Sequence, residues 1–237
     1  MTGCVGPSTI QVGPIKVSEE SRAYYPAIVK ASNSALAVAW KTSYQLSTSE
    51  LRMRLIDRQT LAPLPGAPTT VTAGSLYSQN TIRLVPSPSG FALTYSRKFF
   101  TNSETWCKAH MYDGTGVLLG STFDATVGNV GCTHPSMAHD GTGWGYFHLG
   151  GGGVRLRFLD DTGGMLSTQI VDPATGGNGS VSGFNPTTQE YVVAYTASFN
   201  GGGSEIATAR INLAGTVLDS GVRVSNGVSS SQLPEMA

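Results

Sequence analysis

The sequence reads Asn185-Pro186-Thr187-Thr188 and, two residues later, Tyr191-Val192-Val193-Ala194-Tyr195. The first stretch favours a turn, and the second alternates large and small side chains as a strand does. Three further stretches follow turn signals of their own and read alike: Leu36-Ala37-Val38-Ala39-Trp40, Phe91-Ala92-Leu93-Thr94-Tyr95 and Trp144-Gly145-Tyr146-Phe147-His148. The four stretches recur roughly every 50 residues, which is the spacing of a repeated supersecondary unit.

A second strand is predicted after each of these stretches, and it leads into a turn that opens with Asp or Asn. The four second strands are residues 51–55, 107–111, 154–158 and 206–210, and the turns open at Asp57, Asp113, Asp160 and Asn212. A weaker strand precedes each pair and another follows it, so the unit is a four-stranded meander. Meanders repeated at this spacing predict an all-β fold, a β-propeller of four-stranded antiparallel blades with four full repeats plus a partial one. A β-sandwich with accidental similarity is the alternative.

The ends of the chain supply the partial repeat. Residues 14–18 resemble residues 221–225, and Tyr25-Pro26-Ala27 resembles Leu233-Pro234-Glu235. We therefore expect an N-terminal segment over 1–13 and a propeller over 14–237, with repeats near 26–80, 81–134, 135–179 and 180–233 and with 14–25 and 234–237 as the partial one. A four-unit ring whose termini pair near its closure is favoured. A cut from a longer propeller and completion between chains, through open sheet edges, are the alternatives.

Composition excludes several classes of partner. Charged residues make up 13% of the chain, against roughly 25% in an average soluble domain, and fifteen basic residues balance fifteen acidic ones. Without a basic stripe, no nucleic-acid partner is expected. No apolar stretch approaches the ~20 residues of a membrane helix, so contact with a membrane is expected only through a lipid anchor.

The low charge and the high Ser, Thr and Gly content favour an exported protein, in which two cysteine features fit. Cys4 follows small residues and is a candidate for lipidation, while Cys107 and Cys132 are expected on the same rim of the propeller and are candidates for a disulfide. We therefore expect a secreted protein, or one at the bacterial cell surface or in the periplasm.

The repeated Asp/Asn-x-x-Gly turns, with strands that end in an aromatic residue, resemble those of bacterial secreted propeller-repeat proteins. The resemblance is generic, covers about residues 14–237, and implies the fold but no particular activity.

Aromatic side chains on loops favour a binding surface. Because flat apolar rings suit sugar faces and peptide side chains, we expect a non-catalytic extracellular or cell-surface module that binds a glycan, a protein or a peptide. The candidate ligand-binding residues are Tyr24, Tyr25, Tyr44, Tyr77, Phe99, Phe100 and Phe199.

Metal and cofactor chemistry is not expected. His134 and His148 are a weak candidate for a metal pair, without a recognised ligand motif, and His148 also occupies the position of a packed aromatic in the other repeats. Basic residues recur on the second strands and are expected to pair with carboxylates or backbone; a phosphate or sulfate groove is the alternative. These residues are Arg52, Arg54, Lys108, His110, Arg155 and Arg157.

Hydrolase chemistry is the main alternative function. Propeller glycosidases use paired carboxylates near the ring axis, and the expected inner strands here carry no Asp or Glu, with Glu235 the one acid near such a strand. The sequence therefore leans against an enzyme and leaves a propeller-type glycoside hydrolase, a structural surface protein and a self-assembling propeller fragment as alternatives.

Overall fold

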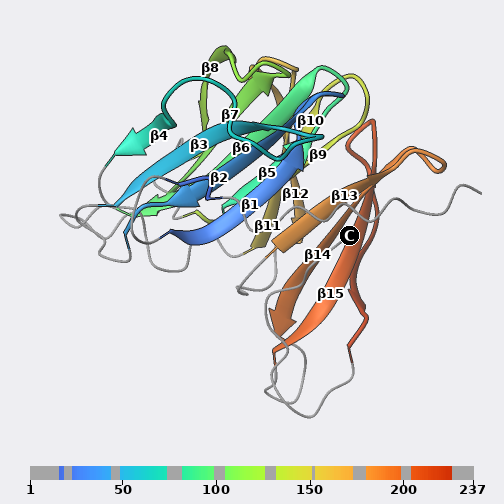
Figure 1. The fold of residues 1–237 in the computed structure, drawn as a ribbon. Helices are drawn as coiled ribbons and strands as arrows, with labels where there is room; N and C mark the ends of the chain where they lie inside the picture. Colours follow the sequence, from blue (N-terminus) through green and yellow to red (C-terminus); the bar gives the residue numbers. More distant parts are fainter. Residues whose placement is uncertain are drawn as a thin grey trace, which may run out of the picture.

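The described part of the chain folds into four four-stranded antiparallel sheets, each built from consecutive strands (Figure 1). The computed structural model describes residues 16–18, 23–43, 49–73, 82–98, 105–125, 132–150, 153–172, 180–198 and 204–225. Within these ranges all regular structure is β, and no helix is long and apolar enough to cross a membrane. The predicted all-β propeller of four-stranded blades is confirmed.

The four sheets are numbered here in chain order. Sheet 1 contains β1 (Tyr24–Lys30), β2 (Ala35–Lys41), β3 (Glu50–Asp57) and β4 (Thr69–Ala73). Sheet 2 contains β5 (Arg83–Pro86), β6 (Gly90–Lys98), β7 (Thr105–Asp113) and β8 (Leu118–Asp124). Sheet 3 contains β9 (Thr133–His139), β10 (Trp144–Gly150), β11 (Gly153–Leu159) and β12 (Met165–Asp172). Sheet 4 contains β13 (Ser180–Asn185), β14 (Glu190–Ser198), β15 (Ser204–Asn212) and β16 (Val217–Arg223).

The turns between the third and fourth strands follow the Asp/Asn pattern of the sequence. The Asp160 carboxylate accepts the backbone N–H of Thr162 and of Gly164, each at 2.8 Å, and the Asn212 side chain accepts that of Thr216 at 2.8 Å. Gly163 and Gly215 adopt φ of 90° and 82°, in the region that favours glycine. These local bonds fix where each hairpin reverses.

Large side chains of one sheet pack on small side chains of the next. Between sheets 1 and 2, Tyr95 lies with Ala37 and Ala39 in one buried cluster. Between sheets 3 and 4, Tyr191 and Tyr195 lie in another cluster with Ala138 of sheet 3. Burying a large apolar side chain stabilises a fold by about 1.5–3 kcal/mol. β9, β10 and most of β6 are therefore buried on both faces, as expected for strands stacked between neighbouring sheets.

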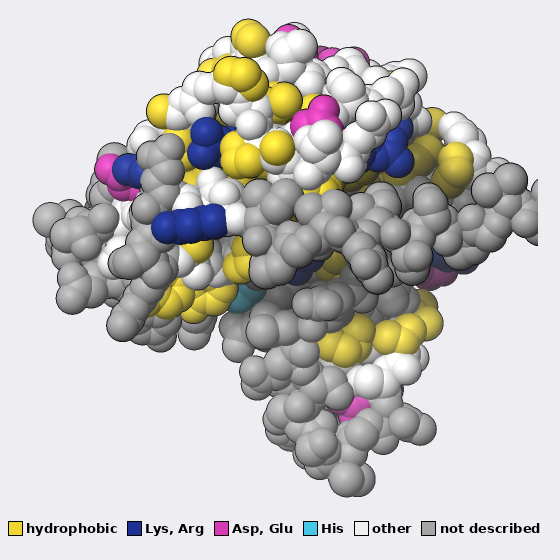
Figure 2. All heavy atoms as spheres, in the orientation of Figure 1, with side chains coloured by type: hydrophobic (Ala, Val, Ile, Leu, Met, Phe, Trp, Pro, Cys, Tyr) yellow, Lys and Arg dark blue, Asp and Glu magenta, His cyan; other side chains and the backbone are white. Residues whose placement is uncertain are grey.

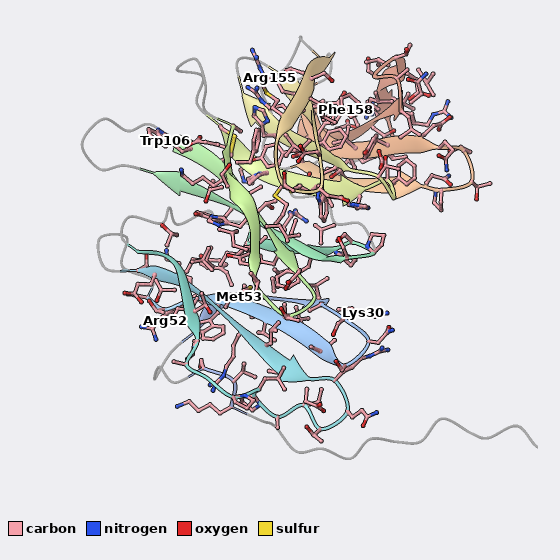
Figure 3. All side chains as sticks on the ribbon, turned by 90° about the horizontal axis from the view of Figure 1, so that it is seen from above. Lys30, Arg52, Met53, Trp106, Arg155 and Phe158 are labelled. Atoms are coloured by element: carbon pink, nitrogen blue, oxygen red, sulfur yellow. A yellow bond between two sulfur atoms is a disulfide. The ribbon has the colours of Figure 1, made fainter. Side chains whose placement is uncertain are left out.

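The sheets follow one another in chain order, with sheet 2 between sheets 1 and 3 and sheet 4 packed on sheet 3 (Figure 3). In the described part of the chain, sheets 1 and 4 share no comparable packing contact. Close to sheet 1, the Arg54 guanidinium donates to the carbonyl of Val17 at 3.5 Å. The predicted pairing of the two termini concerns residues that lie mostly outside the described ranges, and it stays a prediction, as do the domain boundaries.

Candidate functional site

A cavity of about 550 Å³ lies where the first strands of all four sheets converge. We call β1, β5, β9 and β13 the inner strands, and the cavity the axial cavity. Most of its lining residues are apolar in type, although more polar than apolar surface faces the hollow; its polar side chains are Arg83, Ser136 and Ser182. The other lining residues are Ala27, Ile28, Ile82, Leu84, Val85, Pro86, Met137 and Val181. A concave site with both apolar side chains and convergent polar groups has the character of a ligand site.

Hydroxyl groups hold the inner strands in place around the axial cavity. Ser182 Oγ donates to Ser136 Oγ at 3.1 Å, and Ser180 Oγ donates to the carbonyl of His134 at 2.7 Å. Both bonds join β13 to β9, so they fix two walls of the cavity relative to each other without charged groups.

Two inner strands begin with the same backbone irregularity. Tyr25 and His134 both have φ of 51°, both precede a proline, and both lie where the pairing register shifts. A residue before proline is normally extended, so this conformation is a departure that the surrounding structure must impose. Tyr25 is 38% exposed whereas His134 is 5% exposed. The same bulge therefore presents an aromatic ring on sheet 1 and buries an imidazole on sheet 3.

The inner strands carry no Asp or Glu. Several described carboxylates instead serve the turns, where Asp57, Asp113, Asp140 and Asp160 accept backbone N–H groups. For Asp160, the hydrogen bonds from Thr162 and Gly164 lower the carboxyl pKa below its usual value. Such groups stay ionised and are engaged in local structure.

Other described carboxylates are ion-paired on the outer strands. Lys108 Nζ lies 2.9 Å from Asp124 Oδ2, and Arg52 lies 2.9 Å from Glu50 Oε2. Glu205 is paired with Arg223, and Arg210 is paired with Asp219 and Glu190. In the described residues, no two carboxylates are therefore offered to the axial cavity.

The basic residues of the third strands differ in their partners. Arg52 and Lys108 meet carboxylates of their own sheets, Arg155 donates to the Gly150 carbonyl at 3.1 Å, and Arg54 donates to the Gly66 carbonyl at 2.8 Å. Arg157 reaches the neighbouring sheet, where it donates to the Ala125 carbonyl at 3.3 Å. On the face drawn in Figure 2, basic and acidic side chains of the described residues are interspersed among apolar ones. A continuous phosphate or sulfate groove is not formed by these contacts.

His134 and His148 are both buried, and their surroundings oppose a metal cation. Burial, together with the charges of Arg157 and Arg155, lowers the pKa of His148 to about 3, and burial and Arg83 lower the pKa of His134. No group of three His, Cys, Asp or Glu side chains suited to a metal occurs among the described residues. Two imidazoles beside arginines, without a carboxylate, do not make a metal site.

The candidate disulfide residues are joined in the structure. Cys107 opens the buried part of β7 and Cys132 precedes β9, and their Cα atoms are 5.6 Å apart in a Cys107–Cys132 disulfide. The Cys132 N–H also donates to the Thr105 carbonyl at 3.1 Å. The bond therefore fastens sheet 2 to sheet 3.

Only two of the aromatic candidates for ligand binding lie within the described residues. Tyr24 and Tyr25 open β1, with Tyr25 exposed, while Cys4 and the other aromatic candidates lie outside the described residues. Those aromatic candidates are Tyr44, Tyr77, Phe99, Phe100 and Phe199. The sequence did not single out Arg83, Ser136 or Ser182, because nothing local marks a residue as facing the axis.

Comparisons with known proteins support the fold and bear on the function. No family model matches the chain, and no curated protein matches it. A solved structure named as a GH43 endo-arabinanase from Bacillus licheniformis matches with a TM-score of 0.50 and 13% identity, over 87% of this chain and 81% of that one. An endo-arabinase from Bacteroides thetaiotaomicron matches with a TM-score of 0.49 and 10% identity, over 87% and 82% of the two chains.

These matches overturn one expectation from the sequence. The prediction of a non-catalytic binding module is wrong, because the solved structure that matches with a TM-score of 0.50 is named as an endo-arabinanase, a glycoside hydrolase. The physical reason for the error is that loop aromatics suit a sugar whether or not it is then cleaved. Inner strands without acids do not exclude hydrolysis, because carboxylates can reach an axial cavity from other segments.

Proposed function

We propose that this protein is a glycan-degrading enzyme of the glycoside hydrolase type, with its substrate held at the axial cavity. The observation that carries the proposal is the cavity of about 550 Å³ between the inner strands of all four sheets, in a fold similar to that of a GH43 endo-arabinanase. Sites in propellers form where blades converge, because each blade contributes one inner strand to a shared hollow.

The chemistry of the cavity suits a sugar. Ile28 and Leu84 offer apolar surface for the faces of sugar rings, while the Ser182 hydroxyl and the Arg83 guanidinium offer hydrogen bonds to sugar oxygens. Tyr25 is exposed at the start of β1, where a ring can stack on a sugar unit that extends from the cavity. The remaining loop aromatics are proposed to contribute in the same way.

Hydrolysis needs two carboxyl groups that flank the glycosidic bond, one of them a proton donor. These two groups are about 5–5.5 Å apart in retaining enzymes and about 6.5–9.5 Å apart in inverting ones. Since the inner strands and the paired acids described above do not supply these groups, the proposal requires two other carboxylates. Asp161 is paired with His139 at 2.7 Å. The remaining candidates are Glu19, Glu20, Glu104, Asp172 and Glu235, whose side chains lie outside the described residues.

The test is a hydrolysis assay combined with a carboxylate scan. Purified protein is incubated with arabinan and with a panel of other plant and microbial polysaccharides, and new reducing ends are counted. Each of the five candidate acids is then replaced by its amide. We expect two of the five variants to lose at least about 100-fold in rate while keeping the wild-type melting temperature.

Asp113→Asn provides the matched control, because this carboxylate serves a turn. It should lower stability with little effect on turnover. Absence of reducing ends with every polysaccharide, or turnover that survives all five amide substitutions, would contradict the proposal. Arg83→Met should raise KM rather than abolish turnover, since Arg83 is proposed to bind substrate and not to transfer protons.

We also propose that the protein works outside the cytoplasm. A disulfide between Cys107 and Cys132 supports this, because such bonds persist in oxidising compartments. Polysaccharide substrates are found there as well. Fractionation of the native host, with the protein traced by antibody, tests the location.

A further inference from the structure

Arg157 is a buried cation without a counter-ion in the described part of the chain. The residue is 7% exposed, on β11 between sheets 2 and 3. Its Nη2 donates to the Ala125 carbonyl at 3.3 Å, and its Nη1 lies 3.3 Å from both Thr168 Oγ1 and Met165 Sδ. All three acceptors are neutral, and the buried Nε has no hydrogen-bond partner.

Two neighbours of Arg157 also have a buried polar atom without a hydrogen-bond partner. Tyr146 on β10 is directly opposite Arg157 in the strand register, is fully buried, and has no hydrogen-bond partner at Oη. His148 follows on the same face of β10, 2% exposed, with no partner at Nδ1, and its ring centroid lies 5.7 Å from that of Tyr146. We call Tyr146, His148 and Arg157 the buried polar cluster.

Every group of the buried polar cluster is a cation or a neutral donor. Burial, with Arg157 and Arg155 nearby, keeps the pKa of His148 far below neutrality, so its imidazole carries one N–H and no charge. Burial also raises the pKa of Tyr146, with a further contribution from Asp124, so the phenol keeps its proton. Asp124 is paired with Lys108 at 2.9 Å.

The cluster lacks hydrogen-bond acceptors for its donors and a negative charge for Arg157, and neither water nor a metal cation supplies both. Buried polar atoms without partners are rare in proteins, and buried charges without partners are rarer. Each loses the free energy of its hydration by water, and no protein contact compensates for that loss. Water can satisfy the donors but leaves the charge of Arg157 uncompensated. A metal cation would add to that charge. An anion does both, and the burial of all three side chains, between 0% and 7% exposed, favours a small monatomic one.

We propose that the buried polar cluster is a chloride-binding site, in which Arg157 supplies the positive charge and an N–H, and Tyr146 and His148 each donate one hydrogen bond to the ion. The site lies between sheets 2 and 3, and the proposal does not depend on the function assigned to the axial cavity. Chloride bound there would act as a structural ion that links the two sheets.

The test follows thermal unfolding of the purified protein in sodium chloride and in sodium gluconate at equal ionic strength. A ligand that binds only the folded state raises the melting temperature with the logarithm of its concentration above the dissociation constant. We expect this rise with chloride and bromide but not with gluconate. Crystals soaked in bromide should show an anomalous peak beside Arg157.

Variants separate the site from general salt effects. Arg157→Met should abolish the chloride dependence, and it should be at least as stable as the wild type in gluconate, because the uncompensated charge is gone. Tyr146→Phe keeps the ring against Phe123 and should weaken chloride binding by about tenfold. The control is Arg210→Met, which removes an exposed arginine with two carboxylate partners and should keep the full chloride dependence.

Three results would overturn the proposal. One is equal stabilisation by chloride and gluconate, which would indicate screening alone. Another is a chloride dependence that survives in both Arg157→Met and Tyr146→Phe. The third is bromide-soaked crystals with no anomalous peak at the cluster, together with a melting temperature that does not respond to chloride. If Arg157→Met fails to fold, Tyr146→Phe still decides the question.

Discussion

The hydroxyl of Tyr191 on sheet 4 donates to Asp140 Oδ2 of sheet 3 at 2.7 Å. Asp140 also accepts the backbone N–H groups of Thr142 and Gly143, so one carboxylate caps a hairpin and joins two sheets. Burial alone would raise the pKa of Asp140, but these hydrogen bonds outweigh it and lower the pKa. The contact couples the turn of one blade to the packing of the next.

We expect Tyr191→Phe to destabilise the fold by about 1–2 kcal/mol at neutral pH, because a hydrogen bond to a carboxylate is lost while the ring stays. Since the pKa of Asp140 is lowered in the folded state, its contribution is present above the ordinary carboxyl pKa and disappears as the pH falls through the folded value. The difference between variant and wild type should therefore shrink in acid. Urea unfolding at pH 7 and pH 3 measures it, and a constant difference would contradict the role of Asp140.

Gly145 is required by the close approach of the same tyrosine. A Cβ at this position would lie 2.5 Å from Tyr191 Cε1. We expect Gly145→Ala to cost about 1–3 kcal/mol through overpacking. In a double-mutant cycle with Tyr191→Leu, the cost of the alanine should fall, since the clashing ring edge is gone. Additive effects in urea unfolding would show that the two residues do not interact.

The disulfide closes a loop with a sequence separation of 25 residues. The loop-entropy relation gives about 3 kcal/mol of stabilisation for such a loop. We expect the Cys107→Ala/Cys132→Ala double variant to lose about this amount, measured by urea unfolding without reductant. Cys4→Ala is the control and should leave the unfolding midpoint unchanged. A reduced wild-type protein as stable as the oxidised one would refute the prediction.

His110 makes stability depend on pH in mildly acidic solution. It is 7% exposed, its Nε2 lies 3.1 Å from Tyr95 Oη, and burial together with the charge of Lys108 lowers its pKa to about 4. Between pH 6.5 and 4 the unfolded chain binds a proton that the folded protein does not. Stability should therefore be complete above pH 6.5 and fall by roughly 1.4 kcal/mol per pH unit as the pH drops through this window.

His110→Phe should flatten that pH dependence, because the ring keeps its stacking position but no longer titrates. His148 titrates in the same direction and will leave part of the slope in this variant. Urea midpoints between pH 4 and 8 measure the change. An unchanged slope in the double variant His110→Phe/His148→Phe would contradict the assignment.

The sequence predicted the parts of the fold that local chemistry determines. An Asp followed by a Gly, as at Asp160 and Gly163, favours a turn wherever it occurs in a protein. Strands such as Tyr191–Tyr195 alternate large and small residues because neighbouring blades stack on both of their faces. The bulges at Tyr25 and His134 could not be predicted, since φ above zero before a proline is imposed by tertiary packing. The axial cavity was equally hidden, because Arg83 and Ser182 meet there from positions far apart in the sequence.

The Cys107–Cys132 bond works as a clasp between the two middle sheets. Sheets 1 and 4 are each packed on one neighbour among the described strands, whereas sheets 2 and 3 are packed on two and are covalently tied as well. Mechanical or thermal opening should therefore require the least free energy at sheets 1 and 4, which can separate while sheets 2 and 3 stay together. Under mechanical load, we expect sheets 1 and 4 to separate and unfold before the disulfide-linked pair of sheets 2 and 3.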